Sequence, residues 1–387
     1  MKKNFLLVVG LLYGLSLLAQ DYQIPFEEDG LVFIEVSVND HPEAFRFVFD
    51  TGASTSVINA SVAKKLGMKA NFQQQAGGAS GVATYDVVTN QTLHVGKLGL
   101  TVPNLVMVDL SHLEERSGGA IDGIVGYDLI TKFITYLDFD AKVINLYSNT
   151  KEVKDLASFT KISIDKYASI PRVSLQFTLK NGTVLDGEFL FDSGANSNLI
   201  LNTPFVKKHN LETQIGKTYG RKHAGLTSTG RSSIGYVQDV TFGNTTFEDI
   251  PISLSNATAG VLSGERFAGI LGAGIINRFH VVLDYKNDFL YLKPNNQIDK
   301  PFRHNFSGFS FVKKDGKVLI DDVTPNSQAA TLGLEVGDEL LALDSYTGKN
   351  TKLIREMLQK EGKITLRIKK ESGEVQKHIL PLVRLIQ

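Results

Sequence analysis

The strongest constraint on the fold is an internal repeat, because one succession of segments occurs at residues 22–150 and again at 160–298. Each copy opens on an alternating apolar pattern typical of half-buried strands, LVFIEVSV in the first and RVSLQFTL in the second. Each then runs through a turn into an apolar stretch that ends in Asp-(Thr/Ser)-Gly-Ala. The closing segments are also similar, IDGIVGYDLITKFITYLDFD and FAGILGAGIINRFHVVLDYK. We therefore expect two lobes related by duplication.

The spacing within the two copies supports the same interpretation. Asp50 and Asp192 are 142 residues apart, and Gly126 and Gly272 are 146 residues apart. Short runs rich in Val, Ile, Phe, Thr and Tyr predict strands throughout, with few and short helices such as NASVAKKLGM and NTPFVKKHNLE. The chain is therefore predicted to be mostly β, with two lobes that bury a shared interface.

Residues 303–387 do not continue the repeat and predict a separate small domain. This segment reads as strand, turn, strand, short helix, GLEVGD turn, strand, helix and strand. The total length of 387 residues suits two or three domains.

Composition excludes several classes of function. Lys and Arg together number 41, as do Asp and Glu, so the totals give no electrostatic reason to expect nucleic acid as a partner. The absence of cysteine excludes disulfides, thiol nucleophiles and cysteine-based metal sites. The eight histidines show no HExxH or other ligand spacing, and neither GxSxG nor a phosphate-binding GxxxxGK[ST] occurs. We expect no metal and no cofactor.

The first residues predict export. Lys2 and Lys3 precede an apolar stretch from Phe5 to Ala19, which is shorter than the ~20 residues needed to span a bilayer. This pattern favours a cleaved signal peptide at residues 1–19, and an uncleaved anchor is the alternative. After cleavage we expect a soluble protein without stable membrane insertion.

The two Asp residues at apolar strand ends suggest a chemical pair. A single such Asp would be read as a turn residue or a helix cap, but two at equivalent points of duplicated lobes can face each other. Two carboxyl groups at hydrogen-bonding distance share one proton, because both cannot ionise at low cost. The ionised partner can then activate a water while the protonated partner polarises a carbonyl.

These motifs resemble the aspartic peptidases of the pepsin and retropepsin kind. The resemblance rests on the two Asp-(Thr/Ser)-Gly-Ala loops, each with a downstream apolar-apolar-Gly element, and it covers residues 22–298. It implies a two-lobed pair of β-barrels with pseudo-twofold symmetry and a peptide or protein substrate in the cleft between lobes. Both halves are present in one chain, so we expect a monomer.

The resemblance also assigns roles to individual residues. It implies that Asp50 and Asp192 form the catalytic dyad. Supporting residues around the dyad would be Thr51, Gly52, Ser193, Gly194, Gly126 and Gly272.

The family covers its cleft with a hairpin flap, and residues 73–88 are the candidate segment. Gly77, Gly78 and Gly81 suit a mobile hairpin tip, and Tyr85 is a candidate flap aromatic. Residues 222–237 are the counterpart in the second lobe. A plain surface hairpin is the alternative for both segments.

The C-terminal segment resembles a PDZ domain, most clearly in its GLEVGD turn. This resemblance implies a possible peptide ligand added to a strand edge. The residues that would form its groove are Gly308, Phe309, Ser310, Phe311, Leu353, Ile354 and Met357. The alternative is a β-rich domain that only packs on the lobes.

Together these patterns predict an exported aspartic-type endopeptidase with a PDZ-like domain for recognition or regulation. The signal segment and this pairing of domains suggest a bacterial protein of the periplasm or the external medium. The competing hypothesis is a non-catalytic peptide-binding protein of the same fold.

Overall fold

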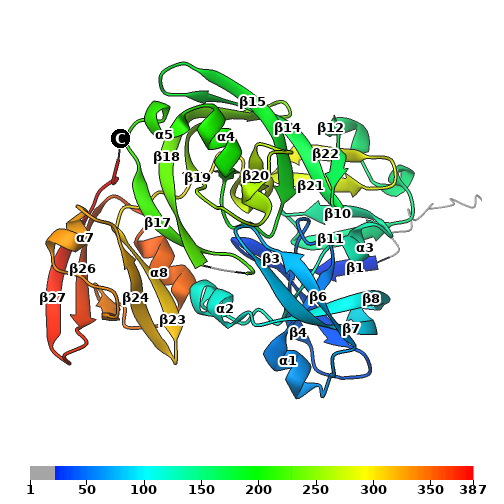
Figure 1. The fold of residues 1–387 in the computed structure, drawn as a ribbon, viewed down its shortest axis with the longest axis horizontal. Coiled ribbons are helices and arrows are strands. Elements are labelled where there is room, and N and C mark those ends of the chain that lie inside the picture. The colour runs from blue at the N-terminus through cyan, green and yellow to red at the C-terminus, as the bar shows by residue number, and fades with distance from the viewer. Residues whose placement is uncertain (1–21, 228, 387) are drawn as a thin grey trace, which may run out of the picture.

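A computed structural model describes residues 22–227 and 229–386 of the chain. It is mostly β, with 48% strand and 14% helix, as the sequence predicted. The described residues form two sheets of eight strands, one of six and one of five, and Figure 1 shows how they are arranged. The predicted signal peptide at residues 1–19 lies outside the described residues.

The first eight-stranded sheet is built from the first half of the chain. Parallel pairing joins β4 to β9 and β5 to β8, and the other neighbours pair antiparallel. The strands follow the order β2 (Glu27–Asp29), β3 (Leu31–Val38), β4 (Phe45–Phe49), β9 (Gly123–Val125), β5 (Ser56–Asn59), β8 (Leu98–Val108), β7 (Val82–Val95) and β6 (Phe72–Gly77).

The second eight-stranded sheet repeats this arrangement strand by strand. Its parallel pairs, β15 with β20 and β16 with β19, occupy the same places, and β14 pairs additionally with β18 as β3 does with β7. The order is β13 (Asp165–Tyr167), β14 (Ile170–Leu179), β15 (Val184–Asp192), β20 (Gly269–Gly272), β16 (Leu199–Leu201), β19 (Thr245–Leu254), β18 (Thr229–Phe242) and β17 (Tyr219–Ala224).

A six-stranded sheet joins the two halves. Its two central strands come from different halves and pair antiparallel, with Thr135 opposite Leu283. One apolar core, which includes Phe47, Phe49, Phe189 and Phe191, runs continuously through both halves. The order of this sheet is β1 (Tyr22–Pro25), β11 (Val143–Tyr147), β10 (Ile134–Asp138), β21 (Phe279–Asp284), β22 (Phe289–Pro294) and β12 (Thr160–Ser163).

The helices are short, and two of them lie where the sequence predicted. The Asn59 side chain accepts the amide of Ser61 at the start of α1 (Ala60–Lys65), and Asn202 caps α4 (Thr203–Lys208) through the amide of Phe205. The other helices are α2 (Ser111–Ser117), α3 (Tyr127–Ile130), α5 (Leu211–Gln214), α6 (Ala273–Ile276), α7 (Gln328–Thr331) and α8 (Thr351–Met357), with 3₁₀ turns η1 (Thr150–Glu152), η2 (Leu156–Ser158) and η3 (Val261–Ser263). No helix among the described residues is long and apolar enough to cross a membrane.

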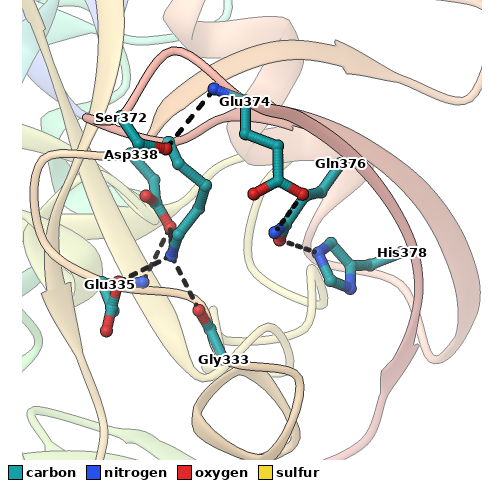
Figure 2. Close-up of polar contacts among 8 residues, drawn as sticks. Gly333, Glu335, Asp338, Ser372, Glu374, Gln376 and His378 are labelled. Atoms are coloured by element: carbon teal, nitrogen blue, oxygen red, sulfur yellow. Dashed lines mark hydrogen bonds and ion pairs between the residues drawn. The ribbon is translucent and has the colours of Figure 1, made fainter.

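A five-stranded sheet with its own apolar core lies within residues 306–382, and we call this part the C-terminal unit. The Lys370 ammonium donates to Gly333 O, Glu335 and Asp338 at 2.9, 2.7 and 3.0 Å and so ties two turns of the unit together (Figure 2). The sheet order is β23 (Phe309–Lys314), β24 (Lys317–Val323), β25 (Glu339–Leu343), β26 (Gly362–Lys369) and β27 (Val375–Leu382).

Candidate active site

The two Asp residues lie next to each other, each at the end of an apolar strand. Asp50 follows β4 directly, and Asp192 is the last residue of β15. The residue before each Asp is a Phe whose side chain is buried in the core, Phe49 in one strand and Phe191 in the other. Both Asp residues remain partly exposed. The burial of each strand therefore fixes an ionisable group at its end.

Reciprocal hydrogen bonds lock the two loops together. The amide of Thr51 donates to Ser193 Oγ at 3.0 Å, and the amide of Ser193 donates to Thr51 Oγ1 at 2.9 Å. Each hydroxyl also donates across the interface, from Thr51 to Phe191 O at 2.7 Å and from Ser193 to Phe49 O at 3.2 Å. Since both side chains are 2% exposed, this arrangement excludes water and fixes the separation of the loops.

The two glycines after these residues hold the carboxyl groups in place. Gly52 N donates to Asp50 Oδ1 at 2.7 Å, and Gly194 N donates to Asp192 Oδ1 at 2.9 Å. A Cβ on either glycine would approach the opposite carboxyl group closer than 3.0 Å. Only a residue without a side chain therefore fits between each loop and the opposite Asp.

Asp50 and Asp192 also hydrogen-bond to each other through their side chains. Burial raises the pKa of both carboxyl groups above the ordinary value, although backbone amides from the loops partly oppose the rise. The pKa of Asp192 is raised further, because the charge of Asp50 adds to the effect of burial. The pair therefore favours a state that holds one proton.

The two apolar-apolar-Gly elements lie directly behind the Asp loops. Asp50 N donates to Val125 O at 2.9 Å, and a Cβ on Gly126 would collide with the carbonyl of Asp50. On the other side, Gly272 pairs with Asp192 in the β15–β20 ladder, and a Cβ there would collide with the carbonyls of Ala195 and Ser197.

The family model described as aspartyl protease matches residues 34–129. That segment contains the whole Asp50 loop and the Gly126 element. The match supports peptidase activity in general. No curated protein matches the chain.

The flap candidate within the matched segment is the β6–β7 hairpin. Its tip turns between Gly77 and Gly81, with Gly78 N donating to Gly81 O at 2.9 Å. The tip reaches the second half, where the amides of Val261 and Leu262 donate to Gly78 O and Ala79 O at 3.0 and 2.8 Å. This hairpin is therefore closed onto the second half, and Ala79 joins an apolar cluster that includes Ala195 beside Asp192.

The β17–β18 hairpin of the second half extends in turn toward the first half. Leu226 joins an apolar cluster that includes Ala53, beside the Asp50 loop, and the half-buried Tyr85. Gly78 of the first hairpin lies against the side chain of Thr227 in the second. The tips of both hairpins thus meet each other and approach both Asp loops.

The residues proposed for the PDZ-like groove take several different positions. Phe309, Phe311 and Ile354 are buried in the core of the C-terminal unit, with Met357 packed against that core. Leu353 is exposed, and Gly308 adopts a φ of 74°. Ser310 Oγ donates to Asp321 at 2.7 Å.

Two parts of the site could not be predicted from the sequence. The first hairpin is held by the backbone amides of Val261 and Leu262, which residues of almost any type supply, beside Gly260, where a side chain would collide with the hairpin tip. Helix α2, whose His112 Nε2 lies 2.9 Å from Gly225 O, is too short to show a hydrophobic period. Within the part of the chain that the structure describes, no three His, Asp or Glu side chains are placed to hold a metal ion.

Proposed function

We propose that this protein is an aspartic endopeptidase in which Asp50 and Asp192 activate a water molecule for attack on a peptide bond. The observation that carries the proposal is the contact between the two carboxyl groups, each of which has the glycine of the opposite loop packed against it. The match of residues 34–129 to the aspartyl protease family supports the same chemistry.

We place the single proton of the pair on Asp192 at the start of the reaction, because burial and the charge of Asp50 both raise the pKa of that carboxyl group. The Asp50 carboxylate removes a proton from water as the water oxygen bonds to the peptide carbonyl carbon. Asp192 gives its proton to the carbonyl oxygen, which produces a neutral tetrahedral diol. The diol returns a proton to Asp192, and Asp50 transfers its proton to the amide nitrogen as the C–N bond breaks. An acid and an amine leave, and the dyad again holds one proton.

The substrate is an extended peptide or protein segment held between the two lobes and beneath the hairpins. Both hairpin tips meet in the described structure, so entry requires at least one of them to move. The chain carries both Asp loops, which supports a monomeric enzyme. Export to a bacterial periplasm or to the medium remains part of the proposal on the basis of residues 1–19.

The test is cleavage of a diverse peptide library between about pH 3 and pH 8, with Asp50→Asn and Asp192→Asn as comparisons. We expect internal peptide bonds to be cut, with a bell-shaped pH profile, and activity to be lost in both variants while circular dichroism is unchanged. Activity that survives in both variants would reject the mechanism. A folded wild-type protein that binds library peptides without cutting them would instead favour a peptide-binding protein.

A further inference from the structure

The C-terminal unit holds helix α2 by its carboxyl end. The Arg355 guanidinium of α8 donates to Arg116 O at 2.6 Å and to Ser117 O at 2.9 Å, and Thr351 Oγ1 donates to Ser117 O at 3.1 Å. The last carbonyls of a helix have no partner within the helix, so these donors satisfy them. Figure 1 shows α2 beside both α8 and β23. The face between this helix and this strand is therefore occupied by a segment of the first half.

Two adjacent carboxylates on β24 extend the contact to the second half. Asp321 Oδ2 forms an ion pair with Arg116 Nη2 at 2.6 Å, and Nζ of Lys222 in β17 lies 3.7 Å from the same oxygen. Asp322 forms an ion pair with Arg231 of β18 at 2.5 Å, and it accepts a hydrogen bond from the backbone amide of Lys222 at 3.1 Å. One strand of the C-terminal unit thus binds α2 and both strands of the second hairpin.

The burial of these carboxylates indicates a specific contact between the C-terminal unit and the rest of the chain. Asp321 is 9% exposed and Asp322 is 6% exposed. Buried carboxylates require charged or hydrogen-bonded partners. The cationic partners of both come from the first and second halves, and Ser310 supplies a hydroxyl to Asp321 from the unit itself.

Both segments that the unit holds also approach the Asp loops. His112 of α2 meets Gly225 of the second hairpin at 2.9 Å. Leu113 and Leu226 share an apolar cluster with Ala53. By contrast, the tip of the first hairpin contacts Val261, Leu262 and Thr227 of the second half. The first hairpin is therefore held by the backbone of Val261 and Leu262 as well as by the tip of the second hairpin, whereas the second hairpin is held by the C-terminal unit.

We propose that the C-terminal unit is an intramolecular latch, whose recognised partner is α2 together with the second hairpin. The latch keeps the second hairpin closed, so that substrate enters by movement of the first hairpin. A protein or peptide that takes the place of α2 on the α8–β23 face would release the second hairpin. This inference rests on the proposed function for its effect on substrate, but the latch itself is measurable without any cleavage.

The experiment compares hydrogen exchange in the full-length chain and in an Asp321→Asn, Asp322→Asn double variant. We expect peptides covering residues 111–118 and 219–227 to exchange at least about tenfold faster in the variant, because hydrogen bonds to charged groups are lost. Peptides covering residues 72–82 of the first hairpin should change much less, because the amides of Val261 and Leu262 still hold its tip. In a cleavage assay, the same variant should show a severalfold higher KM.

The matched control is Glu335→Gln, which makes the same acid-to-amide change inside the unit and removes the exposed ion pair with Lys370 (Figure 2). It should leave exchange in both latched segments unchanged. If the double variant fails to fold, Arg116→Gln tests the latch from the side of the first half. Faster exchange in α2 without faster exchange in the second hairpin would overturn the proposal, as would equal effects in the control. If the wild type cuts no peptide, the exchange result still decides the latch, and only the proposed function fails.

Discussion

Gly194 lies against the carboxyl group of Asp50 so closely that a Cβ on this glycine would come within 3.0 Å of both carboxyl oxygens. Gly52 has the same relationship to Asp192. The two loops are 142 residues apart in the sequence, yet each one shapes the space around the other's acid. The geometry of the pair therefore depends on two positions that have no side chain.

The first prediction concerns this absence of a side chain. Gly194→Ala should displace the Asp50 carboxyl group and lower kcat/KM by about 100-fold, since a shift of ~1 Å in a reacting group has effects of that size. Gly99→Ala is the control, because a Cβ there would meet His94 at an ordinary 3.7 Å. Peptide cleavage and thermal unfolding of both variants provide the measurement. Full activity in Gly194→Ala would show that the carboxyl groups tolerate a different separation.

The second prediction concerns the hydroxyl of Thr51. Thr51→Ala leaves the buried amide of Ser193 and the carbonyl of Phe191 without their partner. Each unsatisfied group costs about 1–3 kcal/mol, so we expect a loss of about 2–4 kcal/mol in the free energy of unfolding. Thr51→Ser keeps the hydroxyl and should recover most of this loss. Equal stability of the Ala and Ser variants in urea unfolding would contradict the assigned bonds.

The third prediction is a pH dependence of stability. The pKa of Asp192 is raised on folding from the ordinary 3.8, so above pH 3.8 the folded chain binds more protons than the unfolded chain. Stability must therefore fall as the pH rises from 3.8 through the raised pKa. Asp192→Asn removes this penalty and should raise Tm at neutral pH by a few degrees, at ~2–4 °C for each kcal/mol.

The gain in Tm should disappear below pH 3.8, where Asp192 is protonated in both states of the wild-type chain. Calorimetry of both proteins from acid to neutral pH measures the difference. Asp40→Asn, at an exposed turn, controls for loss of charge and should show no such trend. A variant that is less stable than the wild type at neutral pH would mean that the Asp192 carboxylate is favoured by contacts other than those described.

The fourth prediction concerns Gly260, which lies where the tip of the first hairpin contacts the second half. Gly260 has a φ of 76°, and a Cβ there would lie 2.5 Å from Gly81 N and 2.6 Å from Gly78 O. Gly260→Ala should therefore move the hairpin tip away from the second half, expose the amides of Val261 and Leu262 to exchange, and raise KM severalfold. Gly264→Ala lies in the same turn with its nearest neighbour at 3.4 Å and should have little effect. Unchanged exchange in Gly260→Ala would argue against this contact.

The sequence predicted the parts of the molecule that depend on side-chain type. The apolar strands ending in Asp50 and Asp192, and the helices capped by Asn59 and Asn202, are encoded by local patterns that physical rules can interpret. The internal repeat added the long-range information, since it placed the two Asp loops at equivalent points. The mostly-β architecture followed from the same strand signals.

The docking of the C-terminal unit was beyond prediction because its contacts join segments with no local signature. Asp321 looks like an ordinary strand residue until Arg116 is found beside it, 205 residues earlier in the sequence. Arg355 donates to main-chain carbonyls, which carry no information about residue type. The contact of the first hairpin with the second half could not be predicted for the same reason, since it uses the backbone amides of Val261 and Leu262.

The six-stranded sheet has a consequence for the order in which the chain acquires its structure. β1 is the first described strand, but its partner β11 begins only at Val143, and β10 must wait for β21, which begins at Phe279. Pairings between segments so far apart carry a large loop-closure entropy and make folding slow. The edge of β10 stays unpaired until β21, which ends at Asp284, is present. The sheet that joins the two halves can therefore be completed only late, after both Asp loops are already present in the chain.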